Sequence, residues 1–494
     1  MSQLNHKESI KSSLIIVLAK WIARLLGLIS TVVIARILMP EDFGLIATAM
    51  IFIGFVDLLS MFGLENALIR KTNTTDQDYN TVWTLQIIQK IIIGMLVVAL
   101  SPLITSGFDD PRLLNLLQVM AIAFFISAFK NIGVVNFRKH LAFKKEFNYT
   151  LIEKILGVII TIILVLYYRN YWGIAYAIVL KSIASLLLSF ILAPYRPKLS
   201  LIGSKEFIGF SMWEFLNNFL RYAQNKIDDL FVARTWGASI LGHFNLSKEL
   251  SSMVLSEVVF PVNRAMIPIY SKHLARNEQS FAKTQCLEMF STLCVVIFPL
   301  CAGMFAVGEI VFPLIFGPQW AIASEMFGWL ALGFIGECLF RYFNSYFVAI
   351  GKVRVFAKYN SLLFLSLIFT LLGVYYFDGS YITLTQVKFI VQTIVFLAIL
   401  IFIAKQISVT FSELINYMIR PVIASITMVL IIEESKSIKI DYAIFNLLFL
   451  ILLGGLSYIS SLFFMCIPGL SNQTKYFEKK AFYILINKLK NRMS

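Results

Sequence analysis

Residues 148–193 read NYTLIEKILGVIITIILVLYYRNYWGIAYAIVLKSIASLLLSFILA. Two runs in this stretch, residues 148–168 and 172–193, are almost continuously apolar and are separated by a short break. A helix of about 20 apolar residues crosses the ~30 Å hydrocarbon core of a membrane. The stretch therefore predicts two membrane-spanning helices joined by a tight turn.

The same pattern continues along the whole chain of 494 residues, of which 59% are hydrophobic and 14% charged. A soluble domain is roughly 45–50% apolar and 25% charged. The runs are too long and too continuous for barrel strands, which alternate over ~10 residues. We predict an all-α membrane protein with about fourteen spans, near 13–36, 43–65, 79–102, 113–135, 148–168, 172–193, 207–233, 241–266, 285–312, 322–348, 357–377, 385–403, 416–432 and 442–466.

The net charge of +15 follows the membrane topology. With the N-terminus in the cytoplasm, the inside loops carry most of the Lys and Arg, and the outside loops carry mainly Asp and Glu, which is the positive-inside pattern. The basic, amphipathic tail of residues 471–494 then lies on the cytoplasmic surface. The sequence thus predicts a multi-pass inner-membrane protein with both termini in the cytoplasm, membrane lipids as partners and no nucleic-acid partner.

The sequence contains no recognisable motif for catalysis, metal binding or ATP binding. The five cysteines lie in or beside apolar runs without metal-type spacing, the four histidines lie in or beside loops, and no phosphate-binding loop of the ATPase type occurs. We therefore expect no enzymatic activity, no metal site and no cofactor.

A short pattern recurs 198 residues along the chain. Ile34-Ala35-Arg36 followed by Gly44 returns as Val232-Ala233-Arg234 followed by Gly242. A weaker match at an offset of 210 pairs Ala121 with Ala331, Phe124 with Phe334, Phe137 with Phe347 and Tyr149 with Tyr359. The repeat aligns spans one to six with spans seven to twelve in the same orientation. It predicts two six-helix lobes, residues 1–200 and 201–405, followed by two extra helices in 406–470.

Charged side chains inside spans are expensive, from ~2.5 to more than ~10 kcal/mol each, and so indicate function. In span one, Lys20, Arg24 and Thr31 share one helix face. The spacing favours the lining of a cationic cavity. The alternatives are that Lys20 reaches the membrane surface and that Arg24 forms a structural ion pair.

Span seven carries the most polar helix face, formed by Glu214, Asn217, Arg221, Asn225 and Asp228. This face is either a cavity wall or a polar seam in which Arg221 pairs with Glu214. Arg221 lies close to the repeat equivalent of Arg24, so each half would offer one guanidinium at a similar depth. Guanidinium groups bind phosphate and pyrophosphate in a bidentate way.

Lys90 in span three and Lys181 in span six are also deep and would extend a cationic cavity. The alternative is an ion pair with Asp57 or another buried carboxylate. Span eight has a milder polar face that includes Asn245. The candidates for an ion-coupling site, which the sequence does not rank, are Asp57, Asp228, Asp229, Glu249 and Glu257.

Two further pairs of charges have simpler explanations. Lys130 and Glu153 lie within two turns of the predicted cytoplasmic edge, so we expect both to reach the membrane surface. Glu337 and Arg341 are four residues apart in span ten and are expected to pair with each other.

Three segments carry a resemblance to a known family: VIARILMPEDFGLIATAM (33–50), NFRKHLAFKKEFN (136–148) and NKIDDLFVARTWGASILGHFNLS (225–247). The chain resembles the polysaccharide flippases of the multidrug/oligosaccharidyl-lipid/polysaccharide exporter superfamily, in the colanic-acid-type branch. The resemblance covers essentially the whole chain. It implies two six-helix lobes in a V around a central cationic cavity, and a lipid-linked oligosaccharide as the partner that is moved.

The implied function is the flipping of undecaprenyl-diphosphate-linked oligosaccharide by alternating access, with a polymerase of the same pathway as a further partner to be tested. A lipid II flippase and a multidrug cation antiporter of the same superfamily are the rival interpretations. A cationic cavity disfavours the antiporter, whereas charge does not separate the two flippases.

Overall fold

The computed structural model describes residues 24–58, 64–71, 73–108, 110–140, 142–204, 212–438 and 442–465, with only the backbone described for 212–221. Within these residues every regular element is a helix, as the all-α prediction requires. The chain divides into two compact units, Met1–Asn245 and Leu246–Ser494. This division falls inside α10 (Met212–Ser251), whereas the predicted lobe boundary at residues 200 and 201 precedes that helix.

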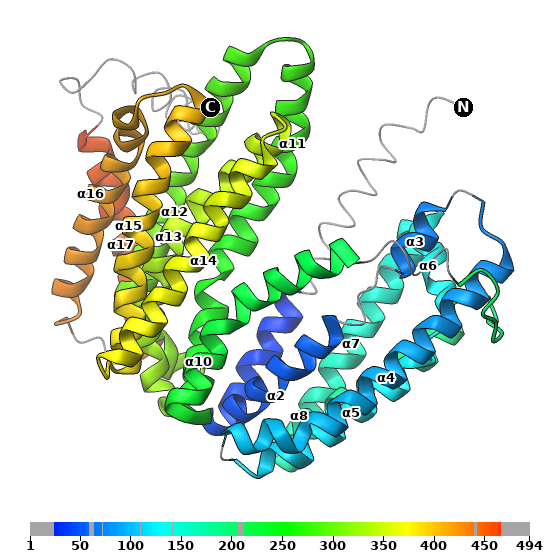
Figure 1. Cartoon of the computed structure of the whole chain (residues 1–494). Helices are drawn as coiled ribbons and strands as arrows, with labels where there is room; N and C mark the ends of the chain where they lie inside the picture. The colour runs from blue at the N-terminus through cyan, green and yellow to red at the C-terminus, as the bar shows by residue number, and fades with distance from the viewer. Residues whose placement is uncertain are drawn as a thin grey trace, which may run out of the picture. The chain divides into compact units, whose positions relative to one another are not determined.

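The first unit is built from long and short helices (Figure 1). A helical stretch at residues 24–37 precedes the first labelled helix. The labelled elements are α2 (Pro40–Leu58), α3 (Leu64–Arg70), α4 (Asp76–Phe108), α5 (Arg112–Ala128), η1 (Ile132–Val134), α6 (Val135–Lys139), α7 (Phe143–Tyr168), α8 (Tyr171–Leu192) and the first part of α10. Helix α4 packs on α5, α5 on α8 and α8 on α7, so these four helices form one bundle.

The second unit repeats this order of pairing, with α12 on α13, α13 on α15 and α15 on α14. Its elements are η2 (Leu255–Val259), α11 (Phe260–Ala275), α12 (Gln279–Ile315), η3 (Pro318–Trp320), α13 (Ala321–Ala349), α14 (Val353–Tyr376), α15 (Tyr381–Ile407), α16 (Phe411–Ser435) and α17 (Ala443–Met465). An aromatic core that includes Phe290, Phe340 and Phe343 fills the bundle. Helices α16 and α17 pack against α12.

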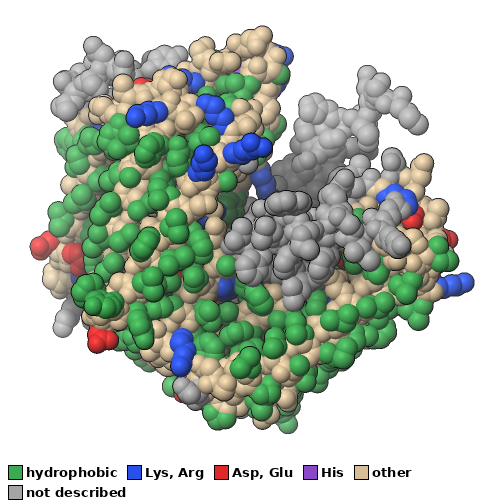
Figure 2. All heavy atoms as spheres, in the orientation of Figure 1, with side chains coloured by type: hydrophobic (Ala, Val, Ile, Leu, Met, Phe, Trp, Pro, Cys, Tyr) green, Lys and Arg blue, Asp and Glu red, His purple; other side chains and the backbone are tan. Residues whose placement is uncertain are grey.

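Hydrophobic side chains cover much of the outside of these helices, as the face in Figure 2 shows. Ile163 and Leu187, for example, are each 58% exposed. Among the described residues, ten helices are long and apolar enough to cross a membrane, or eleven if the bent pair Arg112–Ala128 and Ile132–Lys139 is one span. The run Tyr222–Ala275 is broken at Gly237, whose φ of 81° and ψ of −178° are not helical, and this break falls between the predicted spans 207–233 and 241–266. The predicted count of fourteen stays a prediction.

The two copies of the sequence repeat meet in the first unit. A Cβ atom placed on Gly44 would lie 2.9 Å from the backbone N of Gly242, and one placed on Gly242 would lie 3.0 Å from the backbone N of Gly44. The same two Cβ atoms would overlap the carbonyl oxygens of Ala238 and Pro40, which are themselves 198 residues apart. The contact is therefore reciprocal, as expected for an approximate two-fold relation between the copies.

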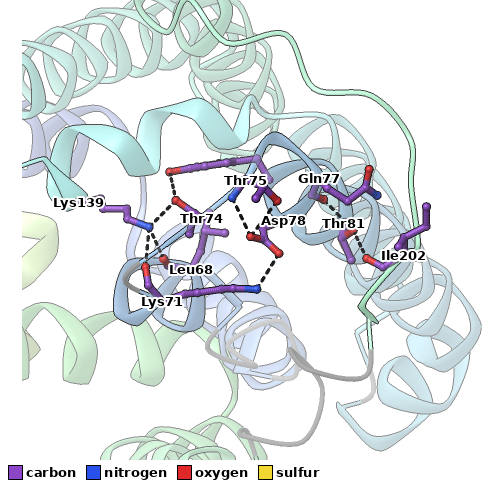
Figure 3. Close-up of polar contacts among 10 residues, drawn as sticks. Leu68, Lys71, Thr74, Thr75, Gln77, Asp78, Thr81, Lys139 and Ile202 are labelled. Atoms are coloured by element: carbon purple, nitrogen blue, oxygen red, sulfur yellow. Dashed lines mark hydrogen bonds and ion pairs between the residues drawn. The ribbon is translucent and has the colours of Figure 1, made fainter.

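Polar contacts fix one end of the first unit (Figure 3). The ammonium of Lys139 donates to the carbonyl oxygens of Leu68 (3.2 Å) and Lys71 (2.8 Å) and to Thr74 Oγ1 (2.6 Å). It thereby caps the C-terminal end of α3. Beside it, Lys71 pairs with Asp78 at 3.0 Å.

The chain that leaves α8 is held along α4 by a ladder of hydrogen bonds. The backbone N of Lys198 donates to Asn80 Oδ1 at 2.7 Å, and that of Ser200 donates to Thr84 Oγ1 at 2.8 Å. Thr81 Oγ1 donates to the carbonyl oxygen of Ile202 at 2.7 Å (Figure 3). These hydrogen bonds hold residues 198–202, which follow α8, against α4 at this end of the bundle.

Acidic residues tie the other end of the bundle, which is predicted to lie outside. Arg112 bonds Asp110 Oδ2 at 2.7 Å and Glu41 Oε1 at 2.5 Å. Asp42 Oδ1 accepts from the backbone N of Tyr171 at 3.2 Å. The first turn of α2 is thereby joined to the starts of α5 and α8.

Acid is expected to weaken this outer end. The hydrogen bonds from Arg112 hold the pKa of Asp110 below its ordinary value. A carboxyl whose pKa is lowered by folding adds stability above its unfolded pKa of about 3.9, and that stability is lost as the pH falls below this value. Asp110→Asn should therefore lower the melting temperature in detergent by a few degrees at pH 7 and by less at pH 3.5. An equal loss at both pH values would contradict the role of this ion pair.

Candidate functional site

A polar pocket of about 320 Å³ lies inside the bundle of the first unit. Its lining comes from α4, α7 and α8 and from the end of α5, four elements that are well separated in the sequence. The lining residues are Lys90, Ser127, Lys130, Glu153, Ile178, Lys181, Ser182, Ser185 and Leu186. Three lysines therefore share the pocket with one carboxylate and three hydroxyls.

Lys90 is positioned by the end of α5. Its ammonium donates to the carbonyl oxygen of Ser127 at 3.3 Å and lies 3.2 Å from Ser127 Oγ. Asp57 and Glu65 attract it electrostatically, and Lys130 repels it. Lys90 lines the pocket, and the predicted alternative of an ion pair with Asp57 or another buried carboxylate stays a prediction.

Lys130 and Glu153 face each other across the pocket at 3.3 Å between Nζ and Oε1. The Lys130 ammonium also lies 5.1 Å from the centre of the Tyr149 ring, a cation–π distance. Ser185 Oγ donates to the same Glu153 oxygen. The two side chains point toward each other because each offers the other a counter-ion, and their predicted reach to the membrane surface stays a prediction.

Lys181 differs from the other two lysines. It lies near the middle of α8, and its side chain is exposed to the pocket. Within the described part of the chain, its ammonium forms no hydrogen bond and no ion pair. A Cβ atom at Gly157 of α7 would lie 3.0 Å from Lys181 Cε, so that glycine leaves room for the lysine stem. Lys181 is a cation available for a ligand.

The pocket is suited to a compact anion. Lysine ammonium groups bind phosphate oxygens as point charges, and serine hydroxyls can donate additional hydrogen bonds. The volume is at the lower end of the range of small-molecule sites, about 300–1,000 Å³. A phosphate or diphosphate group fits this description, whereas an organic cation would meet three like charges.

The site residues predicted in spans one and seven either lie outside the described side chains or do not line the pocket. Lys20 lies outside the described residues, and the side chains of Glu214, Asn217 and Arg221 are not among those described. Arg24 and Thr31 are partly buried on the helical stretch 24–37, and neither lines the pocket. Asn225 is exposed and Asn245 is partly buried in α10. Their assignment to a cavity stays a prediction.

The candidates for ion coupling lie on three helical elements, α2, α10 and η2. Asp228 and Asp229 are 2% and 1% exposed, and Asp229 pairs with Lys226 at 2.7 Å. Asp57 is partly buried in α2, and Glu249 is exposed in α10. Glu257 accepts a hydrogen bond from Ser256 at 3.2 Å. Their role in ion coupling stays a prediction, and no group of three or more His, Cys, Asp or Glu suited to a metal occurs among the residues described.

The second unit contains one buried cation that the sequence analysis did not select. Lys388 of α15 is 8% exposed and lines a very small cavity together with Glu337 of α13. Glu337 pairs with Arg341 at 2.7 Å, which confirms the predicted pair. The cavity has a volume of only about 10 Å³, so it is too small for a substrate.

Ser127 and Ser185 line the pocket but were not predicted, although each lies at helical spacing from a lysine of the pocket. Ser127 and Lys130 are three residues apart, and Lys181 and Ser185 are four apart, so each pair shares a helix face or its extension. Hydroxyl and ammonium groups at this spacing inside apolar runs indicate a polar lining. The spacing does not reveal which helices face one another.

The whole fold is similar to a known membrane protein. The solved structure of the lipid II flippase MurJ in an inward closed conformation matches with a TM-score of 0.71 at 14% identity, over 95% of this chain and 99% of that one. Fold and helices together define a multi-pass α-helical membrane protein. Residues 33–325, more than half of the chain, match the polysaccharide biosynthesis protein family, and the chain belongs to that family.

Two curated relatives agree with this assignment. The lipopolysaccharide biosynthesis protein WzxC of Escherichia coli is 23% identical over 343 residues, which cover 68% of each chain. The succinoglycan biosynthesis transport protein ExoT of Rhizobium meliloti is 23% identical over 341 residues, which cover 67% of each chain. The chain is thus a membrane protein of polysaccharide biosynthesis whose relatives include a transport protein.

Proposed function

We propose that the chain flips an undecaprenyl-diphosphate-linked oligosaccharide across the cytoplasmic membrane by alternating access. The observation that carries the proposal is the lysine pocket of the first unit, in which Lys181 has an available ammonium. The diphosphate is the part of such a substrate that is most costly to place inside a membrane, so a transporter must offset its charge there. Family membership supports a glycan as the head group.

The proposed cycle divides the substrate among three environments. Lys90, Lys130 and Lys181 neutralise the diphosphate, the sugars remain in water-filled space, and the polyprenyl tail remains in lipid. The lobes of residues 1–200 and 201–405 reset the site by rocking, while residues 406–470 add two helices and both termini stay in the cytoplasm. Arg24 and Arg221 are proposed as further cations on the same route. A polymerase of the same pathway would receive the flipped product.

Lipid II is a second candidate substrate because its diphosphate would suit the same pocket, and its known flippase MurJ has a similar fold. The similarity is at 14% identity and carries the fold alone. Rescue of cells depleted of their lipid II flippase would favour lipid II. Rescue of surface polysaccharide in cells that lack this gene would favour the proposed substrate.

Lys181→Met should reduce surface polysaccharide about tenfold or more in cells that lack the chromosomal copy. A charge-assisted contact is worth ~1.5–3 kcal/mol, and 1.4 kcal/mol is a factor of ten. Lys181→Arg keeps the charge and should retain most of the export. Export is measured as surface polymer at equal levels of membrane-inserted protein. Wild-type export by Lys181→Met would remove the pocket from the proposed mechanism.

A further inference from the structure

Glu153 is the only carboxylate among the residues that line the lysine pocket. It lies ten residues after the start of α7, about 15 Å along the helix at 1.5 Å per residue. Lys130 Nζ lies 3.3 Å from Glu153 Oε1, and Ser185 Oγ donates to the same oxygen. An anionic ligand that binds Lys130 would therefore occupy the position that the Glu153 carboxylate holds.

A ligand diphosphate and the Glu153 carboxylate would compete for the same cation. Lys130 has three N–H donors, but two anions close to one ammonium repel each other strongly away from bulk water. Like charges that share a site favour the neutral form of the group that can accept a proton. That group is the carboxylate, because each ammonium is stabilised in its charged form by the incoming anion.

The other titratable groups around Glu153 do not offer an alternative. The pocket is faced by Lys90 from α4, by Lys130 after α5 and by Lys181 from α8. Tyr149 lies under Lys130 with its hydroxyl 3.4 Å from Ser185 Oγ, and Lys154 acts on Lys181 from α7. The lysines supply ammonium groups and Tyr149 supplies a hydroxyl, so Glu153 is the only carboxylate among the described lining residues that a proton can neutralise.

We propose that Glu153 is a displaceable counter-ion that takes up a proton when a diphosphate binds in the pocket. The proton comes from the bulk solution and converts the carboxylate to a carboxylic acid, while Lys130 turns from Glu153 to the phosphate oxygens. When the diphosphate leaves, the acid returns its proton to water and Lys130 pairs with Glu153 again. This inference rests on the proposed function, and it links one proton to each diphosphate bound.

Calorimetry on the purified full chain in detergent tests the link. Binding of inorganic pyrophosphate and of farnesyl diphosphate is measured near pH 7 in two buffers that differ in ionisation enthalpy, which gives the number of protons taken up per ligand. Wild type is expected to take up about one proton more than Glu153→Gln, because only the wild type has a carboxylate to neutralise. Glu153→Gln should also bind about tenfold more tightly at pH 7.5, because it lacks the competing anion.

Glu146→Gln is the matched control. Glu146 lies on the same helix, two turns before Glu153, and pairs with Arg138 at 2.9 Å away from the pocket. It should take up as many protons as wild type. If wild type and Glu153→Gln take up the same number of protons per ligand, the inference is overturned and the diphosphate site remains. The same holds if Glu153→Gln binds the ligand more weakly and takes up as many protons as wild type. Failure of wild type to bind either diphosphate overturns the site and the inference together.

Discussion

Gly242→Val is expected to reduce the yield of folded protein in the membrane at least tenfold and to abolish export. A Cβ atom at this position would overlap the carbonyl oxygen of Pro40 and would lie 3.0 Å from the backbone N of Gly44. Both atoms belong to the backbone of α2, so rotation of a side chain cannot relieve the overlap. Overpacking of a well-packed contact typically costs 1–3 kcal/mol and more where backbone must move.

Gly107→Val provides the control for this prediction. Gly107 lies in α4 of the same unit, and a Cβ atom there would meet nothing within 4 Å. The two variants add the same side chain to helical glycines in different surroundings. Folded yield is measured by fluorescence-detected size-exclusion chromatography of detergent extracts. Similar yields for the two variants would contradict the close approach of α2 and α10.

The double variant Lys130→Met/Lys181→Met is expected to lower export by about 100-fold or more. It removes two of the three pocket lysines and leaves Glu153 without the cation 3.3 Å away. Two charge-assisted contacts at ~1.5–3 kcal/mol each correspond to a factor of about 10²–10⁴. The pocket would then have no net positive charge to attract a diphosphate, since its remaining charged groups are Lys90 and the Glu153 carboxylate.

Lys272→Met/Lys358→Met removes the same amount of charge elsewhere. Both residues are exposed, one in α11 and one in α14 of the second unit. Surface polymer and protein level are compared for the two double variants in the same deletion strain. A loss of export that is equal in both, or absent from the pocket variant, would show that total charge or another site carries the function.

Local features of the sequence were enough to predict the class of protein. Apolar runs such as 148–168 and 172–193 correspond to α7 and α8 within a few residues, because the length of an apolar helix is fixed by the membrane and not by its neighbours. The pairing of Glu337 with Arg341 was also predictable, since residues four apart on a helix always face each other.

The pocket could be predicted only in part. Lys90 and Lys181 were recognised as deep cations, yet their positions in sequence do not reveal that they line the same cavity. Lys130 and Glu153 were assigned to the membrane surface from their distance to the helix ends alone. Their ion pair depends on the packing of both α5 and α7 against α8, which brings together segments that are distant in the sequence.

The repeat shows the same division between sequence and tertiary structure. The sequence by itself determined the all-α class, apolar spans such as 148–168 and 172–193, and the recurrence of Gly44 as Gly242, because hydropathy and repetition are properties of the chain read in one dimension. Only the tertiary structure decided that the two glycines touch each other, and that three lysines and one glutamate from four elements share a pocket. Which helix faces meet depends on packing between distant segments, and no local pattern encodes it.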